Sequence, residues 1–417
     1  MKRFAKSFAA VTRPGWFALH RSKFRETGPA RKPRLYVDVS VILKHDAATG
    51  IQRVVRAIWS GLAETDHEGW DVVPVYAGLT HGYCFANADF FERRQSRSGG
   101  PVGVRPGDKF LGLDLTAHYL PQCVQQLDAW RGAGATVHIV VYDLLPLTQA
   151  GWFNATTRQN FARWFNVVEH HADQALCISD AVRRNVLARL TAGNGPAVGR
   201  LYLSGDIAAS RPSTGVSANV SQVLDQARTR PTVIMIGTVE PRKGYNPALD
   251  AFDRLWLDHS VDAPDLVIIG KPGWKTEHLQ QRIRRHPELG CRLHWLEDAT
   301  DEALALFYQA CRGVLFASRA EGFGLPLAEA AAHRRWILAR DLPVFREQDL
   351  SNVLYFKGDE ADALSRRIMT LVETAGRGDP PLRPLASWSD SIDRLMHELG
   401  IHHASGDVGS NALSLAS

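Results

Sequence analysis

Two glutamates enclose a glycine-rich stretch, EGFGLPLAE, which begins at Glu321 and ends at Glu329. Pro326 suits the first turn of a helix, so the amides of Gly324 and Leu325 are expected at a helix N-terminus, where they can bind a phosphate. A carboxylate on each side of that phosphate can accept hydrogen bonds from sugar hydroxyls. The stretch therefore predicts a sugar-phosphate site. A loop charge followed by a favourable acid near a helix start would give the same pattern.

A second candidate phosphate site lies in the segment IMIGTVEPRKGY. Gly237 follows an expected strand, and Arg242 and Lys243 stand in the loop after it. Ligands of open α/β sheets bind beyond the carboxyl ends of the strands, and an arginine fork beside a lysine suits a diphosphate. Taken alone, the segment could equally be a solvated surface loop. Combined with the two glutamates, it points to a nucleotide sugar.

Both segments belong to a region in which expected strands and helices alternate. Strands are predicted at PTVIMIGTV, PDLVIIG, CRLHWLE, GVLFAS and WILARD, and helices at NPALDAFDRLWLD, TEHLQQRIRRH, DEALALFYQAC and LPLAEAAAHRR. The first half alternates in the same way, from RLYVDVS and a helix starting at Thr49-Gly50 to the helix DAVRRNVLARL, capped by Ser179 or Asp180. The sequence predicts an α/β protein with two doubly wound, Rossmann-like layers.

The boundaries between these layers follow changes in composition. The stretch from Ser204 to Gln222 is rich in small and polar residues and is the expected linker. The predicted parts are a basic arm (1–33), an N-terminal Rossmann-like domain (34–210), a C-terminal Rossmann-like domain (211–385), a last helix (386–401) and a flexible tail (402–417). The last helix could simply cap the second sheet.

Charge is distributed unevenly along the 417 residues. Residues 1–34 carry ten basic residues and one acid, whereas the rest of the chain has a net charge of −4. This aromatic-dotted basic segment could contact an anionic membrane surface through residues 1–30, or be a solvated arm. The sequence has neither a convincing secretory signal nor an apolar run of about 20 residues. We therefore expect a cytoplasmic protein that can be peripheral on the inner face of the cytoplasmic membrane.

Five scattered cysteines without a CxxC pair argue against a disulfide framework or a zinc site and fit a reducing compartment. The chain contains no D-x-D triplet, so the carboxylate pair that would hold a cation on a diphosphate is missing from the sequence. We expect neither a metal nor another cofactor. Nucleic-acid binding is disfavoured, because the body is acidic and the basic segment has no recognition module.

The motifs GTVEPRKGY, VIIGKPGW, EGFGLPLAEAA and ARDLPVFRE, in this order, resemble the retaining glycosyltransferases of family 4, which have the GT-B fold. The segments TGIQRVVR and VYDLLPL resemble a subgroup that adds mannose or rhamnose during bacterial surface-polysaccharide synthesis, including O-antigen and capsule. The resemblance covers roughly residues 35–395. It implies that residues 34–210 form the acceptor domain, that residues 211–385 form the donor domain, and that the last helix (386–401) crosses back to the N-terminal domain.

This resemblance implies roles for individual residues. Arg242 and Lys243 would neutralise the donor diphosphate, Glu321 would bind the transferred sugar, and Glu329 would bind the ribose. The remaining donor-binding residues would be Gly50, Gly237, Thr238, Gly322, Phe323, Gly324 and Leu325. Asp143 is the candidate for orienting the acceptor or the sugar, although it could be a structural residue at a strand end.

Two positions depart from the family pattern. Thr238 stands where many members have arginine, so one phosphate contact is in doubt, and Tyr142-Asp143 replaces a common His-Asp pair. The possible substitutes for that histidine are His45, His81 and His118, each of which is more often structural.

The sequence thus predicts a retaining, metal-independent hexosyltransferase with a nucleotide-sugar donor, GDP-mannose being favoured, and a polysaccharide or lipid-linked acceptor. A rhamnosyltransferase using dTDP- or GDP-rhamnose is almost equally compatible with these motifs. A non-catalytic scaffold subunit of the same fold and, more weakly, a nucleotide-sugar epimerase are the alternatives of other classes.

Overall fold

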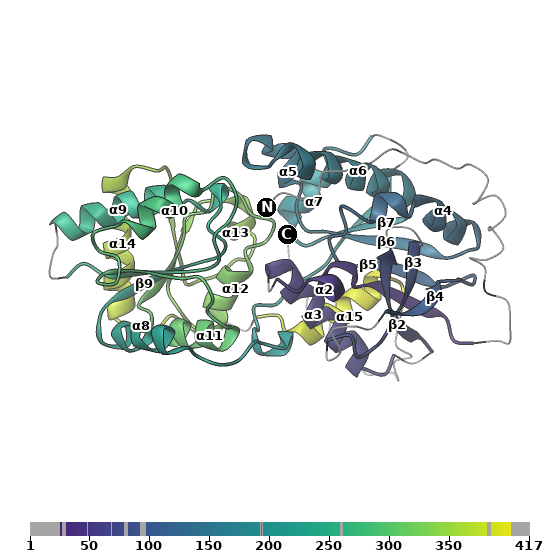
Figure 1. Ribbon diagram of the computed structural model, residues 1–417, viewed down its shortest axis with the longest axis horizontal. Coiled ribbons are helices and arrows are strands. Elements are labelled where there is room, and N and C mark those ends of the chain that lie inside the picture. Colours follow the sequence, from purple (N-terminus) through teal and green to yellow (C-terminus); the bar gives the residue numbers. More distant parts are fainter. Residues whose placement is uncertain are drawn as a thin grey trace, which may run out of the picture.

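The computed structural model describes Glu26 and residues 31–47, 49–67, 69–78, 82–91, 97–191, 193, 195–258, 262–381 and 385–401. The predicted arm (apart from Glu26 and residues 31–33), the predicted tail and His81 lie outside these described residues. The described chain forms two α/β domains placed side by side (Figure 1). The α/β prediction is confirmed.

The N-terminal domain is built on a sheet with the strand order β4-β3-β2-β1-β5-β6-β7-β8. These strands are β1 (Arg34–Asp38), β2 (Asp71–Gly78), β3 (Gly82–Ala86), β4 (Arg97–Pro101), β5 (Lys109–Gly112), β6 (Thr136–Val141), β7 (Gln174–Cys177) and β8 (Ala197–Arg200). From β2 to β8 the neighbouring strands are parallel, whereas β3 and β4 form an antiparallel edge that the sequence did not predict.

Short and long helices connect these strands. They are α2 (Ser40–Lys44), α3 (Gly50–Glu64), α4 (Val124–Gly132), α5 (Leu145–Thr148), α6 (Ala155–His171) and α7 (Asp180–Leu187), with the 3-10 turns η2 (Leu120–Gln122), η3 (Ala150–Trp152) and η4 (Ala208–Ser210). The predicted start of α3 is confirmed, because Thr49 and Gln52 form a capping box there. Ser179 is the cap of α7, since its side chain accepts from the amide of Val182.

The C-terminal domain is built on a parallel sheet with the order β11-β10-β9-β12-β13-β14. Its strands are β9 (Thr232–Ile236), β10 (Asp265–Ile269), β11 (Leu293–Leu296), β12 (Gly313–Phe316), β13 (Ile337–Arg340) and β14 (Val353–Phe356). Its helices are α8 (Ala218–Thr229), α9 (Tyr245–Asp258), α10 (Glu277–Arg284), α11 (Asp301–Ala310), α12 (Leu325–Ala332), α13 (Pro343–Arg346) and α14 (Ala361–Gly376), with the turn η5 (Pro241–Lys243).

Strand β9 shows why the strands in this half of the chain have continuous apolar sequences. Ile234 and Ile236 pack with α8, α11 and α12 on one face of the sheet, and Val233 and Met235 pack with α9, α10 and α14 on the other. Figure 1 shows these helices on opposite faces of the sheet. A strand buried on both faces has no polar alternation, as expected of a doubly wound layer.

The predicted linker is shorter than the small-residue stretch that suggested it. Helix α8 begins at Ala218, inside that stretch, and Ser217 caps it by accepting from the amide of Val220. Serine and alanine are compatible with helix starts as well as with linkers, so composition alone extended the predicted linker too far toward its C-terminal end.

The final helix, α15 (Trp388–Glu398), packs on the N-terminal domain, beside α3. Its apolar face joins the N-terminal core through Trp388, Ile392 and Leu395. A Cβ at Gly61 of α3 would lie 1.9 Å from Cδ1 of Ile392, so a larger residue at position 61 would force this side chain to move. The chain therefore crosses between the two domains twice.

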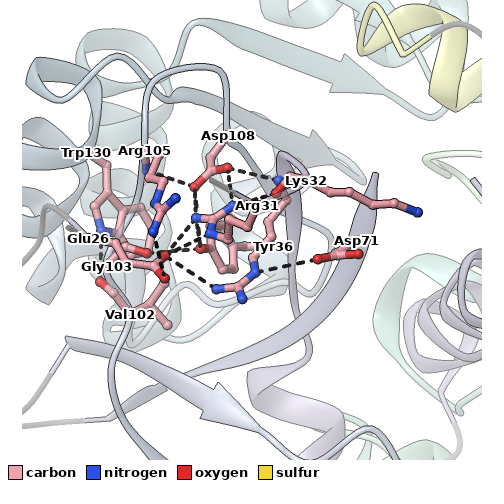
Figure 2. Close-up of polar contacts among 11 residues, drawn as sticks. Glu26, Arg31, Lys32, Tyr36, Asp71, Val102, Gly103, Arg105, Asp108 and Trp130 are labelled. Atoms are coloured by element: carbon pink, nitrogen blue, oxygen red, sulfur yellow. Dashed lines mark hydrogen bonds and ion pairs between the residues drawn. The ribbon is translucent and has the colours of Figure 1, made fainter. Parts of the chain in front are cut away.

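The chain enters β1 through a cluster of charged side chains (Figure 2). Arg31 donates to Glu26 at 3.0 Å and pairs with Asp108 at 2.7 Å, while the hydroxyl of Tyr36 donates to the carbonyl of Gly103 at 2.9 Å. This cluster lies where β1 and β5 begin, at the edge of the sheet opposite the carboxyl ends of the strands. Its contacts hold Glu26 and Arg31 at that edge of the sheet.

Candidate active site between the two domains

The predicted site residues lie at the carboxyl ends of strands from both sheets. Gly237 and Thr238 follow β9, Glu321 lies in the loop after β12, and Asp143 follows β6 of the other domain. In Figure 1, α12 and α13 occupy the side of the C-terminal domain that faces the N-terminal domain. Both sets of predicted residues therefore meet at the domain boundary.

Glu321 is the centre of a cluster of charges. Lys243 donates to its Oε1 at 2.7 Å, and Arg242 donates to its Oε2. Burial alone would raise the pKa of Glu321, but Arg242 and Lys243 outweigh it and lower the pKa to about 2. The carboxylate therefore stays ionised throughout the neutral range, and the predicted diphosphate-binding and sugar-binding side chains form one unit.

Glu240, to which the sequence analysis gave no role, completes this cluster. Its carboxylate is buried and lies 2.7 Å from Arg242, which also donates to the carbonyl of Ala320 at 3.1 Å. Burial raises the pKa of Glu240, although Arg242 and Lys243 act in the opposite direction. Arg242 is thus held by two carboxylates and a backbone carbonyl.

The backbone around Gly237 and Gly244 brings these side chains together. The hydroxyl of Tyr245 donates to the carbonyl of Gly237 at 2.6 Å, and Gly244 has a φ of 71°, which favours glycine. A Cβ at Gly244 would lie 2.2 Å from the carbonyl oxygen of Ala317, at the end of β12. The loop after β9 is therefore packed tightly against the loop after β12.

Asp143 meets this cluster from the N-terminal domain. A Cβ at Gly322 would lie 2.1 Å from the carbonyl oxygen of Tyr142, so only glycine allows the loop after β12 to approach the end of β6 this closely. Burial raises the pKa of Asp143; Arg242 opposes this shift and Glu321 adds to it. The Cβ of Asp143 would lie 3.2 Å from the same added Cβ, so Asp143 is beside Gly322, the residue that follows the predicted sugar-binding carboxylate.

The start of α12 is shaped as the glycine-rich motif predicts. Gly324 is the N-cap, with a φ of 88°, and Pro326 lies in the first turn. Gln348 donates to the carbonyl of Phe323 at 2.6 Å, which fixes the preceding residue. A Cβ at Gly50 would lie 3.5 Å from Cδ1 of Leu325, so the starts of α3 and α12 face each other across the boundary.

Glu329 lies one turn into α12 and is already bonded in this structure. It is 1% exposed, accepts from the hydroxyl of Tyr308 at 2.9 Å and forms an ion pair with Arg53 of α3. Arg53 also pairs with Asp301. The carboxylate predicted to bind ribose is therefore enclosed by protein groups from both domains.

Further polar contacts join the domains at the start of α7. Ser179 donates to the carbonyl of Gly322 at 2.6 Å. The carboxylate of Glu347 accepts from the amides of Asp180 and Ala181, both at 2.9 Å, at the N-terminus of α7. A helix N-terminus favours a negative charge, so Glu347 is well placed to hold the domains together.

The loop after β10, which contains the GKPGW motif, makes additional contacts with the N-terminal domain. Trp274 donates to the carbonyl of Trp152 at 2.8 Å, and Lys275 donates to the carbonyls of Gly151 and Phe153 at 2.9 and 3.1 Å. Lys275 has a φ of 54°, which is an unusual backbone conformation for a residue other than glycine.

The structure describes Tyr142 and Thr238, which depart from the family pattern, and two of the three histidines that were considered as substitutes. The hydroxyl of Tyr142 donates to the carbonyl of Leu113 at 2.8 Å, so the buried ring points into its own domain. His45 and His118 are exposed, and His118 is bonded to Asn160. Thr238 is partly buried beside the site. Among the described residues there is no group of three or more histidine, cysteine, aspartate or glutamate side chains arranged to hold a metal ion.

This architecture is that of known GT-B proteins. HepE of Anabaena, solved in complex with UDP and glucose, is 16% identical, with a TM-score of 0.56 over 89% of this chain and 100% of that one. The sucrose-phosphate synthase of Thermosynechococcus elongatus has a TM-score of 0.56 at 14% identity, covering 86% of this chain and 92% of that one. The chain has the GT-B fold, which confirms the prediction.

Residues 217–379 match the family described as "Glycosyl transferases group 1". Among curated proteins, the serotype-specific mannosyltransferase WbdA of Escherichia coli is 35% identical over 380 residues, which cover 88% of this chain and 45% of WbdA. The O-antigen chain mannosyltransferase B of Escherichia coli is 30% identical over 33% of this chain and 35% of its own length. The chain thus spans about half the length of WbdA.

Proposed function

We propose that the protein is a retaining mannosyltransferase that transfers mannose from GDP-mannose to a growing polysaccharide or lipid-linked glycan. The observation that carries this proposal is the cluster of Arg242, Lys243 and Glu321 against Asp143 of the other domain. Support comes also from the mannosyltransferase WbdA, which is 35% identical over most of this chain. Its role would be in O-antigen or a related surface polysaccharide.

The proposed binding step is an exchange of partners at Glu321. In this structure, Arg242 and Lys243 are bonded to this carboxylate. A donor diphosphate would take over both cations, because phosphate oxygens are strong acceptors for a guanidinium fork and an ammonium group. Glu321 would then be free to accept hydrogen bonds from the hydroxyls of the transferred sugar.

In the proposed reaction, the acceptor hydroxyl attacks the anomeric carbon on the face that the leaving group vacates. The new bond joins the acceptor oxygen to that carbon, and the bond between the carbon and the phosphate oxygen breaks. The hydroxyl proton passes to an oxygen of the leaving diphosphate. Arg242 and Lys243 would stabilise the charge that develops on this leaving group, and Asp143 would orient the acceptor or the sugar.

We propose further that the transfer needs no metal ion. Arg242 and Lys243 both contact Glu321, which shortly precedes the N-cap of α12 in the chain, and these two cations with the helix N-terminus would supply the positive charge that a divalent cation provides elsewhere. Closure of the domains around the donor would exclude water from the reacting atoms. The contacts of Gly322 with Tyr142 and Ser179 support this arrangement.

A panel of nucleotides tests this proposal without knowledge of the acceptor. GDP, UDP, dTDP, ADP and their sugar conjugates are added to the protein, with and without EDTA, and the melting temperature is measured. We expect selective stabilisation by the guanosine compounds that EDTA does not change, because ligands that bind only the folded state stabilise it. Selectivity for dTDP would indicate a rhamnosyltransferase, and stabilisation by none of the compounds would favour a scaffold.

Product analysis then establishes the reaction. A transferase releases free GDP and an extended glycan, whereas an epimerase leaves the nucleotide attached to the sugar. The stereochemistry of the new linkage shows whether the reaction retains the configuration of the donor.

We also propose a cytoplasmic location with peripheral membrane contact through residues 1–30. Among the described residues, no helix is both long and apolar enough to cross a membrane. The ten basic residues among positions 1–34 support an attraction to anionic lipid. Deletion of residues 1–25, which keeps Glu26 in its cluster with Arg31, should weaken sedimentation with anionic vesicles; unchanged sedimentation would rule out this contact.

A further inference from the structure

A cavity of about 250 Å³ lies in the C-terminal domain, away from the site described above. Five arginines line it: Arg228, Arg230, Arg312, Arg334 and Arg335. Arg230, Arg312 and Arg335 stand just before β9, β12 and β13, three neighbouring strands of the parallel sheet. Because the loops that hold Gly237 and Glu321 follow β9 and β12, the cavity occupies the opposite edge of the sheet.

Three of these arginines have carboxylate partners. Arg228 pairs with Asp225 at 2.7 Å, Arg230 with Asp265 at 2.9 Å, and Arg335 with Asp379 at 3.2 Å. These pairs hold the side chains in place and offset part of their charge.

The other two arginines are uncompensated. Arg312 and Arg334 are exposed, and within the described part of the chain their side chains form neither an ion pair nor a hydrogen bond. The cavity therefore keeps an excess of positive charge in a chain whose residues from 35 onward are acidic overall. Two guanidinium groups at one cavity offer ten N–H donors in planar forks, the geometry that suits phosphate oxygens.

The positions of the helices account for only part of this arrangement. α8 and α11 both end at the cavity, and cations are favoured at helix C-termini. The attraction of cations to helix C-termini does not explain the cavity. It also does not explain an arginine at position 334, where the φ of 55° lies in the region that favours glycine. The wall beside it is fixed, since Trp336 donates to the carbonyl of Gly378 at 2.8 Å and Cys311 is buried.

We propose that this cavity binds a phosphate group, with Arg312 and Arg334 as its principal donors and the three paired arginines as its wall. The phosphate would belong either to a small anion in solution or to the headgroup of an anionic lipid. The proposed site is separate from the one for the donor diphosphate and does not depend on the proposed transfer reaction.

The test uses the full chain and the variant Arg312→Ala/Arg334→Ala. Neither side chain has a partner among the described residues, so this variant should fold. The control is Arg163→Ala/Arg285→Ala, which removes two exposed arginines, from α6 and from the loop after α10, and changes the net charge equally. Two probes are used at constant ionic strength: inorganic phosphate, with the melting temperature as readout, and vesicles of phosphatidylglycerol or phosphatidylcholine, with cosedimentation as readout.

Both probes give a decisive comparison. We expect the affinity of the cavity variant for one of them to be about tenfold or more below that of the control variant, because two charge-assisted donors are lost. A loss seen with free phosphate indicates a small anion, and a loss seen only with phosphatidylglycerol vesicles indicates a lipid headgroup. Equal behaviour of the two variants with both probes would overturn the proposal, whatever the outcome of the nucleotide panel.

Discussion

Arg53 of the N-terminal domain and Glu329 of the C-terminal domain form an ion pair across the domain boundary. Each lies about one turn into a helix whose start faces the site, and the starts of these two helices meet at Gly50 and Leu325. Both oxygens of Glu329 are bonded, to Arg53 and to Tyr308. Glu329 is also only 1% exposed, so a ribose could reach this carboxylate only if one of the surrounding protein groups moved, and we expect donor binding to alter the Arg53 contact.

Substitution of Arg53 should open the boundary between the domains. Arg53→Ala leaves the buried carboxylates of Glu329 and Asp301 without their shared cation, and removing one partner of a buried ion pair costs about 3–5 kcal/mol. We expect a lower melting temperature and a larger radius of gyration in solution scattering. The double variant Arg53→Ala/Glu329→Gln should recover part of the loss, because one unpaired charge is gone.

Arg56 provides the matched control for this prediction. It lies on the same helix and pairs with Asp46 of its own domain at 2.6 Å. Arg56→Ala should change the melting temperature less and leave the radius of gyration unaltered. Equal radii for the Arg53 and Arg56 variants would contradict the assignment of Arg53 as an interdomain contact.

Arg242 and Glu329 should both be needed for transfer. Arg242→Ala removes a cation from the predicted diphosphate position, and loss of one such electrostatic donor typically costs about 100- to 1,000-fold in rate. Glu329→Ala should also reduce transfer severely if this carboxylate binds the ribose. Initial rates of GDP release with acceptor present measure both effects. Near wild-type rates in both variants would refute the site assignment.

Arg242→Lys separates the charge of Arg242 from its geometry. Lysine keeps the positive charge but not the planar fork that contacts both Glu240 and Glu321. We expect a rate between those of the wild type and Arg242→Ala. A rate equal to that of the wild type would show that charge alone suffices at this position.

The sequence predicted the loops of the site better than the contacts between them. Arg242, Lys243 and Glu321 could be placed at the ends of strands, because apolar runs and glycine-rich turns are local signals. The partners of Glu329 could not be predicted, since Arg53 lies 276 positions away in the chain and one sequence contains no information on such pairings. The motif TGIQRVVR contains Arg53, but nothing in it shows which carboxylate the arginine contacts.

The antiparallel edge of the first sheet and the contact of Glu347 with the N-terminus of α7 were missed for related reasons. Strand β4 has the sequence RSGGP, whose glycines and proline are typical of loops, and it forms only because β3 lies beside it. Glu347 reads as an ordinary surface acid near the end of a short helix. Its role is visible only when α7 of the other domain is placed against it.

Gly322 should control how closely the two domains can approach. In Gly322→Ala the new Cβ would lie 2.1 Å from the backbone oxygen of Tyr142, a distance that forces one loop to move. We expect a large loss of transfer, with little change in the stability of the individual domains. Gly376→Ala is the control, because a Cβ there meets no atom within 4 Å. Equal transfer rates for these two variants would show that the close approach at Gly322 is not required.

Two buried carboxylates of the N-terminal domain should make its stability depend on pH. Asp38 accepts from Tyr83 at 2.7 Å and from Ser40, while Asp114 accepts from the amides of Val41 and Ile42, each at 2.8 Å. Burial raises the pKa of Asp38 to about 6, despite these hydrogen bonds. Burial, with the nearby charge of Asp38, raises the pKa of Asp114 to about 7.

Groups with a raised pKa in the folded state bind protons more tightly there than in the unfolded chain. Their contribution to stability is full below about pH 4 and is lost as the pH rises through about 6 to 7. Asp114→Asn cannot titrate, so the unfolding free energy of the wild type should fall relative to this variant between pH 5 and pH 8. Urea unfolding at several pH values measures that difference. If asparagine loses one backbone hydrogen bond, the loss is the same at every pH and does not change how the difference varies with pH. A difference that is constant with pH would show that Asp114 does not titrate in this range.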